Sequence, residues 1–143
     1  MTTLTALRSS IAHGESETLE FKRSTAELQR AGRTLCGFLN GDGGQVLLGV
    51  GPKGQLVGQQ VADITLGDIA ATLSRFEPAA RIGMEHIDIG DGRAVIVLDA
   101  PASRQFGPYV FEGRPYKRVG PTTTSMAQEE YARLLLDRNH SRH

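Results

Sequence analysis

The sequence predicts one α+β domain in which helices pack against a single mixed, mainly antiparallel sheet. Three observations support this fold class. The 143 residues suit one hydrophobic core. Apolar residues make up 39% and charged residues 22%, which is ordinary for a globular protein and excludes a disordered chain. The predicted order of elements is α, β-α-β-β, α, β-β, β, α, and its hairpins favour antiparallel pairing.

The first predicted element is a short amphipathic helix. Its apolar residues recur at helical spacing: Leu4, Leu7 and Ile11. Gly14 follows and ends the helix. We therefore expect an N-terminal helix within residues 1–13, a main domain over residues 14–138 and a flexible tail over residues 139–143.

A strand, a helix and a second strand follow. In residues 19–22, Leu19 and Phe21 should face one side of a sheet, and Glu20 and Lys22 the other. A capping box then opens a helix whose apolar stripe is Leu28, Ala31, Leu35 and Leu39. The next strand is almost wholly apolar, which indicates a central, buried position.

That buried strand is predicted over Gln45–Val50, after the glycine-rich turn Gly41–Gly44. The turn is not a phosphate-binding loop, because no Gly-Lys-Ser/Thr follows it and it leads into a strand instead of a helix. Its glycines are better explained by the end of the helix and by close backbone packing.

The second half of the chain alternates turns, strands and helices. The expected elements are a returning strand at 55–57, a helix from Thr65 to about Arg75, strands at 84–89 and 93–98, a loop over 100–112, a strand at 116–119 and a helix capped by Ser125 and Gln128. The threonine-rich segment before that last helix is assigned to the start of the helix.

Composition constrains location and partners. Formal net charge is zero, so no global field predicts a nucleic-acid partner, although thirteen arginines accompany only three lysines. The single cysteine, Cys36, cannot form an internal disulfide, which favours a reducing compartment. No secretion signal and no apolar run near the roughly 20 residues of a membrane span is present. We expect a soluble, cytoplasmic protein.

An ordered set of motifs resembles the Schlafen-type AlbA domain family. The motifs are Glu15-Ser-x-x-x-Glu-Phe-Lys22, Phe38-Leu-Asn-x-x-Gly-Gly44, Leu48-Gly-Val50, Gly54-x-x-x-Gly58, Pro108-Tyr109 and Tyr116-Lys-Arg-Val-Gly120. The resemblance covers residues 14 to 137. It implies an AlbA-like nucleic-acid-binding domain, and in the animal members two copies of the fold form a groove for tRNA-like RNA. A single copy should therefore act as a homodimer.

The resemblance also implies a metal-dependent ribonuclease site. In the similar enzymes, glutamates at the positions of Glu15 and Glu20 join an aspartate just after the Gly-Val strand. Here Gly51 and Pro52 follow that strand, so the third carboxylate is missing unless Asp42 or Glu17 replaces it. A zinc site like that of the animal proteins is also excluded, because one cysteine cannot build it.

The acidic stretch has two interpretations. Carboxylates that converge on Mg²⁺ or Mn²⁺ would cleave phosphodiesters, with Glu15 and Glu20 as ligands and catalytic residues and Lys22 near the phosphate. Alternatively, the strand is half exposed, and Glu20 pairs with Lys22 or with a nearby arginine. Because Glu20 lies five positions after Glu15, the two glutamates would face opposite sides of one regular strand, and they converge only if Glu15 lies on the turn before the strand.

A basic and aromatic segment is the second candidate site. It contains Arg104, Tyr109, Arg114, Tyr116, Lys117 and Arg118. Aromatic rings between arginines suit nucleotide stacking and phosphate contact, although the aromatic residues can equally belong to the core.

The sequence thus predicts a protein that binds RNA or DNA through this segment. Two alternatives remain: a divalent-metal endoribonuclease that uses Glu15 and Glu20, with weak activity because one ligand is missing, and a regulatory module that binds other proteins.

Overall fold

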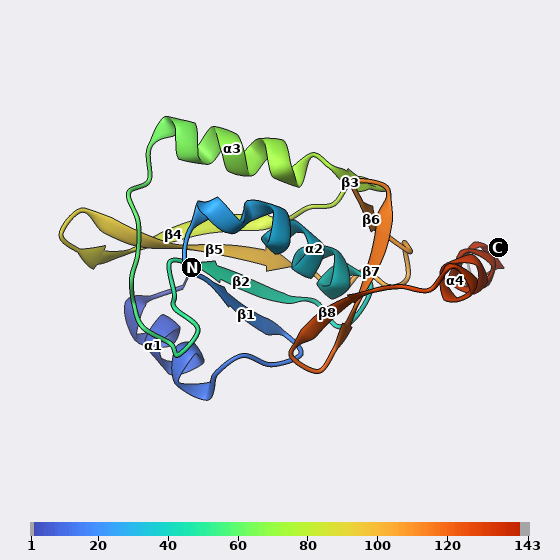
Figure 1. Ribbon diagram of the computed structural model, residues 1–143, viewed down its shortest axis with the longest axis horizontal. Coiled ribbons are helices and arrows are strands. Elements are labelled where there is room, and N and C mark those ends of the chain that lie inside the picture. Colours follow the sequence, from blue (N-terminus) through green and yellow to red (C-terminus); the bar gives the residue numbers. More distant parts are fainter. Residues whose placement is uncertain (1, 141–143) are drawn as a thin grey trace.

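Residues 2–140 are described by the computed structural model, and they form two four-stranded sheets with four α-helices. The predicted α+β class is confirmed, with mixed and mainly antiparallel pairing (Figure 1). The predicted single sheet is wrong, because the strands divide into two groups that pair only among themselves.

The first sheet has the order β1-β2-β5-β4. Its strands are β1 (Leu19–Lys22), β2 (Gly44–Leu48), β4 (Gly83–Gly90) and β5 (Arg93–Ala100). Only β1 and β2 are parallel, because the helix α2 (Leu28–Leu39) connects them as a crossover. A short 3₁₀ turn, η1 (Thr25–Glu27), leads into α2, and Ser24 caps it by accepting a hydrogen bond from the Ala26 N–H at 3.1 Å.

The second sheet has the order β3-β6-β7-β8 and is antiparallel throughout. Its strands are β3 (Phe76–Glu77), β6 (Val110–Phe111), β7 (Arg114–Val119) and β8 (Thr122–Ser125). The chain leaves β5 through the loop 101–109, and β6 and β7 then pack against α2. Helix α2 packs against β2 and β7, and therefore joins the two sheets.

Several strand and helix limits differ from the expectations. The threonine-rich segment is the strand β8, because its side chains are β-branched and the turn at Gly120 and Pro121 folds it back onto β7. The expected strand at 55–57 reduces to one bridge between Val50 and Leu56. Thr65 lies at the third position of its helix, where its side chain accepts from the Ala62 N–H at 3.2 Å.

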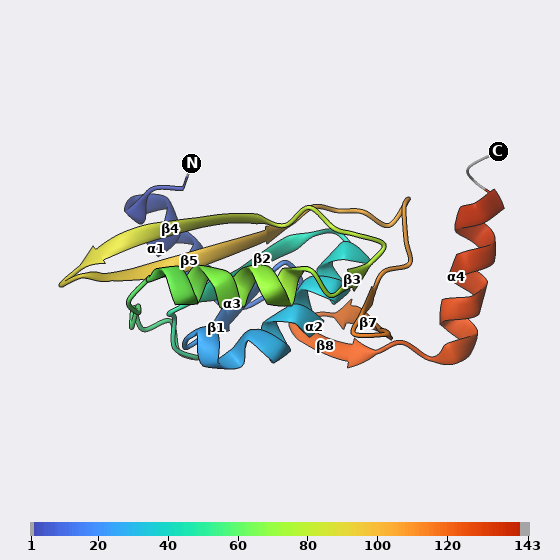
Figure 2. The same ribbon diagram turned by 90° about the horizontal axis from the view of Figure 1, so that it is seen from above.

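Two apolar clusters lie on opposite faces of the first sheet. Helix α1 (Leu4–His13) covers one face, and α2 with α3 (Asp63–Leu73) covers the other (Figures 1 and 2). The alternation predicted for β1 is confirmed: Leu19 and Phe21 belong to the α1 cluster, so Glu20 and Lys22 point to the α2 side.

The terminal helix α4 (Gln128–His140) projects away from both sheets (Figure 2). The first two residues of the expected tail, Asn139 and His140, are helical, and residues 141–143 lie outside the described part of the chain. Within residues 2–140, no helix has the length and apolar character needed to cross a membrane.

Two helix glycines should respond in opposite ways to replacement by alanine. A Cβ at Gly32 in α2 would lie 2.2 Å from the Phe111 ring, which is fully buried, whereas a Cβ at Gly67 in α3 would meet no atom within 4 Å. We expect Gly32→Ala to lower the free energy of unfolding by about 1–3 kcal/mol through overpacking. Gly67→Ala should raise it by roughly 0.5–1 kcal/mol through helix propensity.

Urea unfolding of the two variants and the parent protein measures both effects. Because each change adds the same methyl group to a helix, a loss of stability for Gly67→Ala as large as that for Gly32→Ala would contradict the packing assigned to α2.

Candidate functional site

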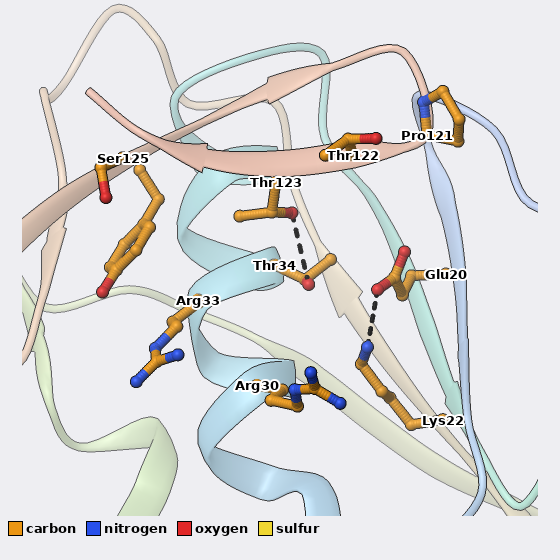
Figure 3. A pocket seen from close by; sticks show the side chains of 10 residues that line it. Glu20, Lys22, Arg30, Arg33, Thr34, Pro121, Thr122, Thr123 and Ser125 are labelled. Atoms are coloured by element: carbon orange, nitrogen blue, oxygen red, sulfur yellow. Dashed lines mark hydrogen bonds and ion pairs between the residues drawn. The ribbon is translucent and has the colours of Figure 1, made fainter. Parts of the chain in front are cut away.

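A cavity of about 460 Å³ lies where α2, β1 and β8 meet (Figure 3). We call it the α2–β8 pocket. The residues that line it are Glu20, Lys22, Arg30, Arg33, Thr34, Tyr116, Pro121, Thr122, Thr123 and Ser125. Three of the charged side chains are cations and one is an anion, so the pocket is positive although the whole chain is neutral.

The cations and the hydroxyl groups occupy different walls of the pocket. Arg30 and Arg33 extend from α2 and Lys22 extends from β1, while the hydroxyl groups of β8 lie along the opposite side (Figure 3). Arg30 and Arg33 are exposed and lie off the apolar stripe of α2. They are three positions apart, so both lie on one face of the helix. Thr34, on the same helix, is buried, and its hydroxyl oxygen accepts a hydrogen bond from the Thr123 hydroxyl at 3.3 Å.

The buried side chain of Arg118 connects the elements that form this pocket. Its side chain is only 2% exposed. One terminal nitrogen, Nη2, donates to the carbonyl oxygen of Ser16 at 2.8 Å, to that of Leu19 at 3.3 Å and to Glu20 Oε1 at 3.0 Å. The other terminal nitrogen donates to Thr123 Oγ1 at 2.9 Å. A single guanidinium group therefore links the loop before β1, β1 itself and β8.

Phe38 completes the surroundings of Arg118. The guanidinium carbon lies 5.0 Å from the centre of the Phe38 ring, which is a cation–π contact from the core of α2. The Nε of Arg118 is buried and has no hydrogen-bond partner. The other guanidinium nitrogens all have partners inside the protein, so the positive charge of Arg118 is not available to a ligand.

Glu20 is the counter-ion of two cations. Its Oε2 accepts from Lys22 Nζ at 2.8 Å, and its Oε1 accepts from Arg118. Burial alone would raise the pKa of Glu20, but the hydrogen bond and charge of Lys22, together with the charge of Arg118, outweigh burial and lower the pKa. Glu20 is therefore ionised at neutral pH. This matches the paired interpretation of the acidic stretch.

Glu15 lies on the turn before β1, as convergence with Glu20 requires. Both glutamates and Lys22 line a second cavity of about 470 Å³, together with Glu27, Val50 and Pro52. However, Glu15 Oε2 accepts a hydrogen bond from the Phe21 N–H at 3.0 Å. One of the two carboxylates is thus engaged with the backbone and the other with cations.

The residues present do not fit a divalent metal. Among the side chains that the structure describes, no three of His, Cys, Asp or Glu come together in a way that could hold one. Asp42 lies apart and pairs with Arg104. Two cations already surround Glu20, and their charges would oppose a metal ion at the same oxygens.

Half of the basic and aromatic segment is buried. Tyr109 and Tyr116 belong to the core, and the side chain of Arg118 is enclosed as described. The backbone of Tyr109 is held by Asn40, whose Oδ1 accepts from the Tyr109 N–H at 2.7 Å and whose Nδ2 donates to the Tyr109 carbonyl at 3.0 Å. Tyr109 therefore does not offer its ring for stacking, and Tyr116 contributes only to the lining of the α2–β8 pocket.

The other half is exposed but scattered. Arg104 pairs with Asp42 beside the end of α2, and Lys117 Nζ pairs with Glu130 Oε1 of α4 at 2.8 Å. Arg114 is exposed at the start of β7. The six predicted residues thus do not form one surface in the structure.

Sequence reasoning missed the cations of α2 and the hydroxyl groups of β8. A signal for the first was present, since Arg30 and Arg33 share a helix face away from the apolar stripe. The threonine-rich run was a signal for a β-strand. Neither pattern indicated that the two segments face each other.

Comparison with known proteins shows what this chain is similar to. The family model described as Schlafen, AlbA_2 matches residues 15–127. A search of curated proteins gave no match.

Two solved structures share the fold. The solution structure of the N-terminal domain of a putative ATP-dependent DNA helicase RecG-related protein from Nitrosomonas europaea has a TM-score of 0.62 and 25% identity, and the match covers 92% of this chain and 97% of that one. The DIP2311 protein from Corynebacterium diphtheriae has a TM-score of 0.60 and 16% identity. The match to DIP2311 covers 92% of this chain but only 27% of that protein.

The position of Arg118 predicts a large stability effect. We expect Arg118→Ala to lower the free energy of unfolding by about 3–5 kcal/mol, because Glu20 and the two carbonyl oxygens lose their shared donor. Urea unfolding at neutral pH measures this loss.

Two further variants test the cause. Arg114→Ala, on the exposed end of the same strand, should change stability by no more than about 0.5 kcal/mol. A triple variant, Glu20→Met with Lys22→Met and Arg118→Met, should recover much of the loss, because it removes all three interacting charges together. If Arg118→Ala cost less than the Arg114→Ala control, the role of Arg118 as the link would be disproved.

Proposed function

Because the chain belongs to the Schlafen AlbA_2 family, we propose that it is a nucleic-acid-binding domain that contacts phosphate groups through the α2–β8 pocket. The observation that carries the proposal is the arrangement of Lys22, Arg30 and Arg33 around one concave, hydroxyl-lined cavity. Phosphate contacts by Lys and Arg supply most of the affinity in such complexes.

The chemistry of the pocket suits an anion. Its one carboxylate, Glu20, is already neutralised by Arg118, so the charges of Lys22, Arg30 and Arg33 are available to a ligand. The solved relative from Nitrosomonas europaea is named as a DNA helicase-related protein, and its N-terminal domain is matched almost throughout. That name supports a nucleic-acid ligand here. We also propose a cytoplasmic location, where such a ligand is present.

We propose that binding needs no divalent metal. Gly51 and Pro52 offer no side-chain oxygen, and Glu27, the third carboxylate of the cavity that Glu15 and Glu20 line, is engaged by the Arg23 N–H and by Arg30, so among the described residues no three ligands come together there. One observation favours the ribonuclease alternative, namely that both glutamates and Lys22 line one cavity. Metal-dependent cleavage of RNA distinguishes this alternative from binding alone.

The binding proposal predicts a specific loss in an Arg30→Gln, Arg33→Gln double variant. We expect weaker binding to unrelated oligonucleotides alike, and a salt dependence of log K that is flatter by roughly 1.5–2 in slope, because two phosphate contacts are lost. Fluorescence anisotropy with labelled RNA and DNA, over a series of salt concentrations, measures both quantities.

An Arg104→Gln, Arg114→Gln double variant is the matched control, since it removes the same charge from exposed positions outside the pocket. A larger loss in this control than in the pocket variant would move the interface to the loop and β7. Binding should survive EDTA. Cleavage of RNA that requires Mn²⁺ and disappears in a Glu15→Ala, Glu20→Ala variant would overturn the metal-free proposal.

We also propose that the protein acts as a homodimer. Helix α4 projects from the body and exposes Leu136 at 66% and Leu135 at 38%, and such a short helix is marginally stable in water without a partner. Light scattering at micromolar concentration should give twice the mass of one chain. A Leu135→Glu, Leu136→Glu variant should give the mass of one chain, and a parent protein that is already monomeric would refute the dimer.

A further inference from the structure

The cations of the α2–β8 pocket lie at two depths. Arg30 forms part of the rim, where its side chain is 71% exposed and pairs weakly with Glu27 at 3.6 Å. Arg33 is exposed on the same face of α2. Lys22 forms the floor, where its side chain is 13% exposed beside Glu20. A ligand that meets the rim therefore need not reach the floor.

Lys22 retains binding capacity at that depth. A lysine ammonium group has three donors. Among the described residues, the hydrogen bond shown for Lys22 Nζ goes to Glu20 Oε2, which leaves two donors for a ligand. Because Arg118 also neutralises Glu20, that carboxylate does not cancel the attraction of the floor for an anion.

The opposite wall is polar and uncharged. Thr122 and Ser125 lie on the exposed edge strand β8, and their side chains line the pocket above the cations (Figure 3). Hydroxyl groups donate and accept hydrogen bonds, so they suit the oxygen atoms of a sugar or of a phosphate. The cavity of about 460 Å³ falls in the range of small-ligand sites, roughly 300–1,000 Å³, which is room for about one nucleotide.

A duplex and a single strand meet this pocket differently. The phosphates of a duplex lie on a stiff helix whose neighbouring nucleotides stay stacked and paired, so such a phosphate can touch Arg30 and Arg33 but cannot descend to Lys22. A flexible single strand can turn one phosphate inward while its neighbours remain outside.

Resting on the proposed function, we infer that the pocket admits one nucleotide of a single-stranded nucleic acid, with its phosphate on Lys22, and that the protein therefore prefers single strands to duplexes. The rim arginines serve both kinds of nucleic acid. Lys22 serves the single strand alone. The same chemistry is shared by RNA and DNA, so the choice between them is left to the probes.

The test uses the full chain and four labelled 12-nucleotide probes: single-stranded RNA, single-stranded DNA and the two matching duplexes. The parent protein should bind single strands at least about tenfold more tightly than duplexes at the same salt concentration. Lys22→Gln should reduce single-strand affinity about tenfold and duplex affinity only about two- to threefold, because a duplex senses this charge without contacting it. The Arg30→Gln, Arg33→Gln variant should weaken both.

Three further variants separate position from charge and folding. Lys22→Arg keeps the charge and should retain most single-strand binding. Arg8→Gln removes one charge from α1, on the opposite face of the first sheet, and should change neither affinity. Ser125→Phe leaves Lys22 intact but adds a ring to the pocket-facing side of the exposed strand β8, so it should abolish the preference even if a Lys22 variant folds poorly.

The outcomes distinguish this inference from the proposed function. Equal binding of single strands and duplexes by the parent protein, or an equal loss on both in Lys22→Gln, would overturn the inference and leave phosphate binding in place. A preference that survives Ser125→Phe would also overturn it. No binding of any probe at low salt would overturn the proposed function itself.

Discussion

The guanidinium group of Arg118 is the link on which the two sheets and the pocket depend. It reaches from β7 of the second sheet to the loop before β1, to β1 and to β8, and it lies over a ring of α2. Arginine suits this position because its donors are held in a fixed planar fork and it stays charged when buried. A lysine could contact one of these oxygens well, but not carbonyl, carboxylate and hydroxyl groups in three directions.

This link also sets the electrostatics of the site. Arg118 is enclosed and balanced by Glu20, so their two charges largely cancel inside the protein. Lys22, which shares Glu20, and the two arginines of α2 then supply a net positive field at the cavity. Although the whole chain has no net charge, the cavity is positive, because its only carboxylate is already paired with the buried Arg118.

Local patterns were predictable from the sequence, and long-range contacts were not. The alternation of β1, the apolar stripe of α2 and the hairpin of β4 and β5 depend on neighbours in the chain, and all three appear in the structure. The role of Arg118 depends on a partner 98 residues away, so a pattern of arginines between aromatic residues could equally indicate a surface. The division into two sheets likewise depends on α2 lying between them.

The same acidic motif can serve a metal ion or an ion pair, and its surroundings decide between these uses. A hard cation needs several free oxygens that converge. Here Glu15 gives one oxygen to a backbone N–H, and Glu20 gives both of its oxygens to cations. Glu27, the third carboxylate of the cavity that both glutamates line, accepts from the Arg23 N–H and pairs with Arg30. This group of residues therefore suits an anion better than a metal ion, because Glu20 holds Lys22 and Arg118 in place and has no free oxygen for a metal.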